Sequence, residues 1–210
     1  MLEYKISHIS KGNKRPCIKM NPQYITIHST ANPYSTAQNE RDWLVNPKND
    51  RQASWHICVD EKEAIEAIPL DEVAWHAGDG RGDGNMKSIA VEICESGNRE
   101  VTVANAIKLV AAMLQKYNWG IDKLRRHYDW SKKNCPRIFA ADNWIGWELF
   151  KWEVARELGN KVKISLHGKE MFIDGEIKNG VTMVPIRFIE RLGYKVDWDD
   201  KEQKININYK

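Results

Sequence analysis

The chain has 210 residues, of which 42% are hydrophobic and 29% charged, the composition of an ordinary globular protein. The net charge is only +3 with basic and acidic residues interleaved, which argues against a nucleic-acid binder with a basic stripe. No run approaches the ~18 apolar residues that span a bilayer, and residues 1–16 carry charges where a signal peptide needs an apolar core. We therefore expect no stable membrane insertion, and synthesis in the cytoplasm without a signal peptide.

The first part of the chain predicts short strands with one helix between them. YITIHST at 24–30 is rich in β-branched residues and ends in polar ones, which favours a strand. Residues 35–47 predict a short helix that stops before the proline at its end. The runs 54–60 and 63–70 predict the two strands of a hairpin, and the glycines within 78–84 indicate a loop.

SIAVEIC at 88–94 predicts another strand, with an acidic residue in its middle. The alternation puts Ile89, Val91 and Ile93 on one face, and Glu92 with its small neighbours on the other. A carboxylate inside so apolar a strand is costly unless a cation or a hydrogen-bond donor meets it. Glu92 is therefore a candidate functional residue.

The rest of the chain predicts two helices, followed by a region of short strands. Residues 102–120 and 142–159 have helical periodicity; Gly120 lies beyond the end of the first helix, and Gly159 closes the second. We expect an α/β fold in residues 1–160, with a mixed central β-sheet flanked by helices. Residues 161–210 predict a small α+β domain with short strands, a brief helix around Pro185–Leu192 and a closing hairpin.

Four cysteines stand far apart and form no C-x-x-C pair, so we expect free thiols. Cys17, Cys58 and Cys94 are expected to be buried as small hydrophobic residues. Cys135 differs because it lies eight residues after His127, in the segment HYDWSKKNCPR. Histidine nitrogen and cysteine thiolate are ligands that zinc prefers.

A catalytic zinc site takes three protein ligands, so the pair His127 and Cys135 needs a partner from elsewhere. His28 is favoured because it lies at the end of a rigid strand. The spacing alone leaves open another histidine, no third ligand, or a coincidence of structural residues. The other candidates are His8, His56, His76 and His167.

Four segments in order, ITIHST, NPKNDRQASWHICVDEKEAIEAIPLDEVAWHAGDGRGDGN, SIAVEICESGN and RHYDWSKKNCPRI, resemble the zinc-dependent N-acetylmuramoyl-L-alanine amidases of the type-2 amidase family. That family includes phage endolysins, bacterial autolysins and peptidoglycan recognition proteins, and the resemblance covers about residues 20–158. It implies a Zn²⁺ ion held by His28, His127 and Cys135. The implied reaction cleaves the amide bond between N-acetylmuramic acid and L-alanine of the peptidoglycan stem peptide.

The resemblance also implies two catalytic residues. Glu92 matches the family's glutamate that acts as base for the attacking water, and Lys133 matches a lysine that stabilises the oxyanion. Lys132 is expected to be a solvated surface residue. Some family members carry a catalytic tyrosine where this chain has Trp55, so Glu92 must carry the base function here. His56 and His76 remain as residues of the core or the cleft wall.

GVTMVPIRFIERLGYKVDWDDKEQKINI resembles a small domain related to the N-terminal domain of copper amine oxidases. His167 is the single histidine of residues 161–210, and they contain no cysteine, so copper binding is not expected. We expect this domain to bind a cell-wall polymer; the alternative is that it only stabilises or dimerises the chain. Together the resemblances predict a phage or prophage endolysin acting at the bacterial wall after release. An autolysin and a non-catalytic peptidoglycan-binding protein are the alternatives.

Overall fold

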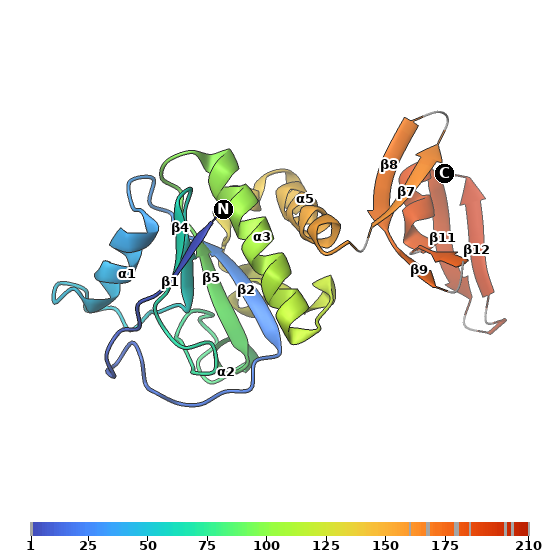
Figure 1. Cartoon of the computed structure of the whole chain (residues 1–210). Coiled ribbons are helices and arrows are strands. Elements are labelled where there is room, and N and C mark those ends of the chain that lie inside the picture. The colour runs from blue at the N-terminus through green and yellow to red at the C-terminus, as the bar shows by residue number, and fades with distance from the viewer. Residues whose placement is uncertain are drawn as a thin grey trace. The chain divides into compact units, whose positions relative to one another are not determined.

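The computed structural model describes residues 2–159, 161–166, 169–178, 181–184, 186–199, 201–202 and 204–209. His167 and Pro185 lie outside these residues. The chain divides into two compact units, Met1–Val154 and Ala155–Lys210, and each is described by itself (Figure 1). No helix among the described residues is long and apolar enough to cross a membrane.

A six-stranded sheet forms the centre of the first unit. Its strands are Glu3–Ile6 (β1), Tyr24–Ser29 (β2), Ile57–Val59 (β3), Glu63–Glu66 (β4), Ser88–Ile93 (β5) and Leu124–Arg126 (β6). The order is β1-β4-β3-β5-β2-β6, with β3 and β4 antiparallel and the other neighbours parallel. The predicted mixed sheet and its hairpin are confirmed, whereas β1 and β6 were not predicted.

Helices flank this sheet. They run over Ala37–Val45 (α1), Asp83–Met86 (α2), Arg99–Tyr117 (α3), His127–Ser131 (α4) and Ala141–Glu157 (α5). Figure 1 shows α3 lying along the sheet, where it contacts β3 and β5, while α1 contacts β3 and β4. The helix expected before Gly120 ends at Tyr117, because Asn118 takes the left-handed conformation (φ 55°) that asparagine tolerates. The regular part of α5 begins after Trp144, since residues 142–144 have positive φ.

The two central strands carry the core and set the position of the site. Ile25 and Ile89 are fully buried and face each other across the parallel pair β2 and β5. The same register pairs His28 with Glu92, near the carboxyl ends of both strands. Because neighbouring residues in register project to the same face, the two polar side chains lie side by side.

The second unit consists of short strands. They pair as three antiparallel hairpins: Lys161–Leu166 (β7) with Lys169–Asp174 (β8), Glu176–Lys178 (β9) with Val181–Met183 (β10), and Tyr194–Asp199 (β11) with Lys204–Tyr209 (β12). The brief helix expected before β11 is a 3₁₀ helix over Ile186–Leu192.

All four cysteines are free, but their burial was only partly predicted. Cys58 on β3 and Cys94, which directly follows β5, are both buried, with their sulfur atoms 3.4 Å apart. The expectation that Cys17 is buried is wrong. It lies in the exposed segment before β2, which carries no core-forming pattern.

Candidate metal centre

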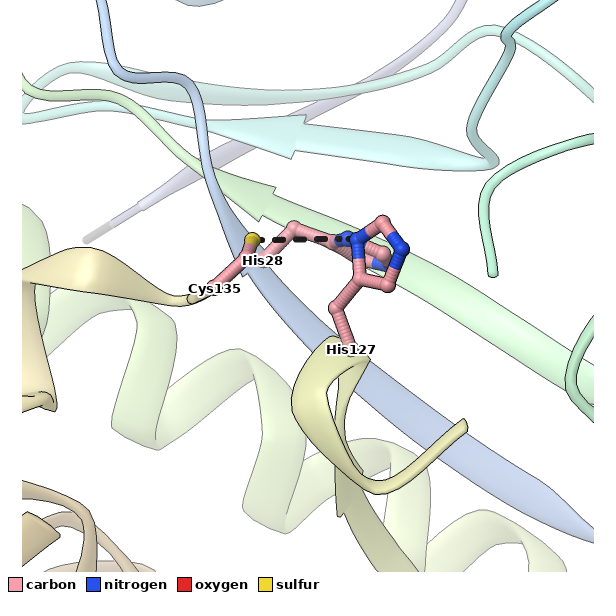
Figure 2. Close-up of side chains that lie close together, drawn as sticks. All are labelled: His28, His127 and Cys135. Carbon is pink, nitrogen blue, oxygen red and sulfur yellow. Dashed lines mark hydrogen bonds between the residues drawn. The ribbon is translucent and has the colours of Figure 1, made fainter. Parts of the chain in front are cut away.

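His28, His127 and Cys135 meet at the carboxyl end of the central strands (Figure 2). The Nδ1 atoms of the two histidines are 3.0 Å apart, and Cys135 Sγ lies 3.8 Å from His28 Nδ1. All three ligand atoms lie within 4.8 Å of one another, and all three residues are buried. The residues nominated by the sequence thus come together in space, although 99 positions separate the two histidines.

The short strand β6 brings the second histidine to this place. It pairs in parallel with β2 and runs directly into α4, whose first residue is His127. The turn is held by Asp129, which accepts a hydrogen bond from the Arg126 backbone (2.7 Å) and pairs with its guanidinium (2.6 Å). The Tyr128 amide then donates to the Cys135 carbonyl (3.0 Å), which draws the cysteine back toward the helix start.

Two other histidines are engaged elsewhere. His56 is fully buried, accepts a hydrogen bond from the Ala90 amide (2.9 Å) and donates to the Glu72 carbonyl (2.7 Å), so neither ring nitrogen is free for a metal. His8 pairs with Glu66 at 2.7 Å. His56 is therefore a core residue, and one of the open alternatives for a third ligand is removed.

The donor set has the chemistry of a zinc site. Burial lowers the pKa of His127 to about 4, with Lys133 adding to the effect, and burial also lowers the pKa of His28, so both imidazoles are neutral near pH 7. Burial raises the pKa of Cys135 to about 12, so the thiolate needs a nearby cation. Tetrahedral zinc places two nitrogens roughly 3.3 Å apart, and a nitrogen and a sulfur roughly 3.6 Å apart, close to the two separations above.

Glu92 lies beside these residues with an unmet hydrogen-bonding capacity. Its Oε1 is 4.0 Å from His28 Nδ1, and its side chain is 15% exposed. Burial raises the pKa of Glu92 to about 8. Its Oε2 is buried without a hydrogen-bond partner among the described residues. Such an atom calls for a water molecule, an ion or a substrate group.

Lys133 is exposed and lines the same cleft. Its charge lowers the pKa of His127, and it also lowers the pKa of Glu92, where burial acts in the opposite direction and prevails. Lys132 is exposed as well, as expected, but its Nζ lies over the Tyr128 ring at 5.1 Å. Two adjacent lysines therefore have different surroundings.

A cleft of about 910 Å³ opens onto this cluster. Trp55 lines this cleft and packs against two buried hydrophobic clusters, one that includes Leu44 and Ile68 and one that includes Cys58 and Ile65. A second hollow of about 530 Å³ shares Trp75, His76 and Lys133 with the first. The two hollows therefore adjoin at the residue cluster and offer room for an extended ligand.

The sequence reasoning missed the clamp between Glu95 and Arg137. Arg137 donates to Glu95 through Nε (2.9 Å) and Nη2 (2.6 Å), and its backbone amide donates to Ser29 Oγ (3.1 Å). Glu95 also accepts from the Ala31 amide at 3.0 Å. The clamp ties the loop after β2 to the segment after Cys135. No periodicity marks such a pair, because its members lie 42 positions apart.

The fold and the cluster define an α/β domain with two buried histidines, one buried cysteine and a partly buried glutamate in an open cleft. The profile of the family described as N-acetylmuramoyl-L-alanine amidase matches residues 18–138, and the chain belongs to this family. A second profile, described as copper amine oxidase N-terminal domain, matches residues 153–207. Both family resemblances drawn from the sequence are confirmed.

Relatives and solved structures agree with this membership. The chain is 44% identical to the N-acetylmuramoyl-L-alanine amidase CwlA of Bacillus subtilis, covering 70% of this chain and 55% of that one. It is 35% identical to a CwlA of Bacillus sp, covering 88% and 79%. The catalytic domain of XlyA, a B. subtilis amidase, superposes with a TM-score of 0.68 at 37% identity, covering 73% of this chain and 99% of that structure. The chain spans about half the length, 45% to 55%, of the B. subtilis relatives CwlA, XlyB, XlyA and CwlH.

Proposed function

We propose that the protein is a zinc-dependent N-acetylmuramoyl-L-alanine amidase that hydrolyses the amide bond between N-acetylmuramic acid and L-alanine of the peptidoglycan stem peptide. The observation that carries this proposal is the approach of His28, His127 and Cys135 beside Glu92 in one open cleft. Relatives named as amidases of this kind support the substrate class.

His28, His127 and Cys135 would hold the zinc ion as two neutral imidazoles and one thiolate. When bound, the ion supplies a Lewis acid that polarises the amide carbonyl, lowers the pKa of water and favours the carboxylate form of Glu92. Three protein ligands leave one position of a tetrahedral site open, as catalysis requires. A structural zinc site would take four protein ligands.

Glu92 and Lys133 would carry the protein's part of the reaction. The unpartnered oxygen of Glu92 accepts a proton from the attacking water, and the same carboxyl group then gives a proton to the leaving amine of L-alanine. The ammonium group of Lys133, at the cleft wall, stabilises the negative charge that develops on the carbonyl oxygen. Trp55 cannot take the role of a catalytic tyrosine, because an indole N–H is far too weak an acid to give up its proton in the reaction and its nitrogen accepts none.

Product analysis tests the reaction. Purified peptidoglycan is incubated with the zinc-loaded protein, and the products are identified by mass spectrometry. We expect free stem peptides with new L-alanine amino groups and no new reducing sugars. New reducing ends would indicate cleavage of the glycan instead, and the absence of any product would indicate a recognition protein without catalysis.

We further propose that the protein acts as a phage or prophage endolysin at the cell wall, and that the second unit binds a wall polymer. A solved relative with 38% identity is an endolysin of Bacillus subtilis, which supports the first part. A wall-binding unit would raise the local concentration of substrate bonds. Removal of residues 161–210 should reduce both sedimentation with purified walls and lysis. Unchanged binding and lysis would contradict the anchoring role.

A further inference from the structure

His76 contacts His28 at the His28 ring nitrogen that does not face His127 and Cys135. The two rings meet edge to face with centroids 5.1 Å apart, and His28 Nε2 is 3.1 Å from His76 Nδ1. The other nitrogen of His76, Nε2, is 3.2 Å from the Ser88 carbonyl oxygen. Both histidines are buried, with exposed fractions of 1% for His28 and 7% for His76. The three groups thus form a chain that ends on a backbone acceptor.

The acceptor fixes the direction of every hydrogen bond in this chain. A carbonyl oxygen only accepts, so His76 must carry its hydrogen on Nε2 and donate to Ser88. In a neutral imidazole the other nitrogen, His76 Nδ1, is then bare and accepts from His28 Nε2. A neutral His28 with its hydrogen on Nε2 has a free lone pair on Nδ1. That atom faces His127 and Cys135.

His76 is itself held in place through its backbone. Its amide donates to Asn85 Oδ1 (2.7 Å), and the next amide, of Ala77, donates to the same oxygen (2.8 Å). The Asn85 side chain donates in turn to the Gly80 carbonyl (2.9 Å), which closes the loop around it. The acceptor residue Ser88 also contacts Thr26 on β2, the strand that carries His28. The chain of hydrogen bonds therefore has rigid supports at both ends.

We infer that His76 is a positioning residue, which selects the tautomer of His28 that presents Nδ1 to a metal ion. The inference rests on the proposed function in that the ion is the zinc of the amidase. The neighbouring backbone serves the second histidine, because the hydrogen bond to the Ala77 backbone acts on the His127 imidazole. Residues 76 and 77 thus each form a hydrogen bond with one of the two candidate ligand imidazoles. Outer partners of this kind typically change metal affinity by about 10–100-fold.

A matched pair of substitutions in the full chain tests the role of His76. Asparagine and leucine have nearly the same shape, but only the amide oxygen of His76→Asn replaces the Nδ1 acceptor. We expect His76→Leu to bind zinc about 10–100-fold more weakly in competition with a chromogenic chelator, and His76→Asn to stay close to the wild type. Equal affinities of the two variants, whether weakened or unchanged, would overturn the inference. Thermal unfolding of the metal-free variants shows whether each one is folded.

Nitrogen NMR of the metal-free wild-type chain tests the tautomer without any substitution. Imidazole ¹⁵N shifts distinguish a protonated from a bare ring nitrogen, and we expect His28 and His76 both to carry hydrogen on Nε2. Hydrogen on Nδ1 of neutral His28 would overturn the inference. A wild-type chain that shows the expected tautomers and binds zinc but does not cleave peptidoglycan would refute the proposed function alone.

Discussion

At the scale of single residues, Glu92 stands out because it is a mostly buried carboxylate in a strand whose other residues on that face are small. Its raised pKa, about 8, means that the folded metal-free chain disfavours the carboxylate form. Desolvation of this carboxylate costs free energy of folding, and a hydrophobic residue at the same position would not incur that cost. A cost of this kind is typical of a position under functional rather than structural selection.

Replacement of Glu92 by glutamine should separate its role as the catalytic base from its cost to the stability of the fold. We expect Glu92→Gln to retain zinc but to lose turnover by about 10²–10⁴-fold, because the base for the water is removed. We also expect the metal-free variant to unfold at a higher temperature than the metal-free wild type at pH 7. Calorimetry and a peptidoglycan turbidity assay measure the two effects. A variant that is less stable and fully active would contradict both roles.

The two adjacent lysines provide a matched comparison. Lys133 acts on the pKa of His127 and Glu92, whereas Lys132 lies over the Tyr128 ring. We expect Lys133→Met to reduce kcat by about 10²–10³-fold, the effect of removing one oxyanion-stabilising group, without loss of bound zinc. Lys132→Met removes the same charge one position away and should keep nearly full activity. Equal losses in the two variants would show that only the net charge matters.

At the scale of elements, an ion pair holds the N-terminal segment against the loop before α2. Arg15 donates to Glu72 through Nε (2.8 Å) and Nη2 (3.1 Å), and to the Ile9 carbonyl (2.7 Å). The hydrogen bonds from Arg15 lower the pKa of Glu72 below its ordinary value, against a smaller opposing effect of burial. The Glu72 carbonyl also accepts from His56, so one residue joins three parts of the unit.

The sign of the pH effect follows from that lowered pKa. The folded state prefers ionised Glu72, so the pair contributes stability above the unfolded pKa of 4.5 and loses it as the pH falls through the folded value. Glu72→Gln should therefore destabilise the chain by about 1.5–3 kcal/mol at pH 7, the range for hydrogen bonds to charged groups. The difference should shrink below about pH 4.5. Urea unfolding at both pH values measures it, and a difference that is constant with pH would rule out the ion pair as its source.

The sequence predicted the central strands, the hairpin and the long helix, because each has a clear apolar period. It could not predict β1, whose residues are exposed, or β6, which has three residues and no alternation. The apolar period of each strand also does not predict the order of the strands in the sheet or their register. The pairing of His28 with Glu92 depends on the alignment of two parallel strands that share no local signal.

Prediction of the site from the sequence was limited in a similar way, because local patterns do not show which distant residues meet. Family resemblance nominated His28, His127 and Cys135, and the structure brings the three together. Spacing alone could not distinguish His56 from His76, because each follows a tryptophan. Their hydrogen-bond partners distinguish them. The Ala90 amide and the Glu72 carbonyl occupy both ring nitrogens of His56. His76 instead contacts the candidate ligand His28.

At the scale of the whole molecule, the proposed metal ion couples to folding. A ligand bound only by the native state stabilises it by RT ln(1 + [L]/Kd), about 2.7 kcal/mol at a free concentration 100 times Kd. The unfolding temperature of the wild type should therefore rise with added zinc and fall with a chelator. Cys135→Ser should lower the zinc content and flatten this dependence. An unfolding temperature that ignores zinc in the wild type would contradict the metal centre.

The separation of the three candidate ligands along the chain has a consequence for how the protein matures. His127 and Cys135 lie 99 and 107 positions from His28, and β6 brings them to it through its parallel pairing with β2. Contacts of such long range form late, because the entropy of closing a long loop must be overcome first. Full metal capture would then be one of the last events of folding. A newly made chain would stay inactive until its central sheet is complete.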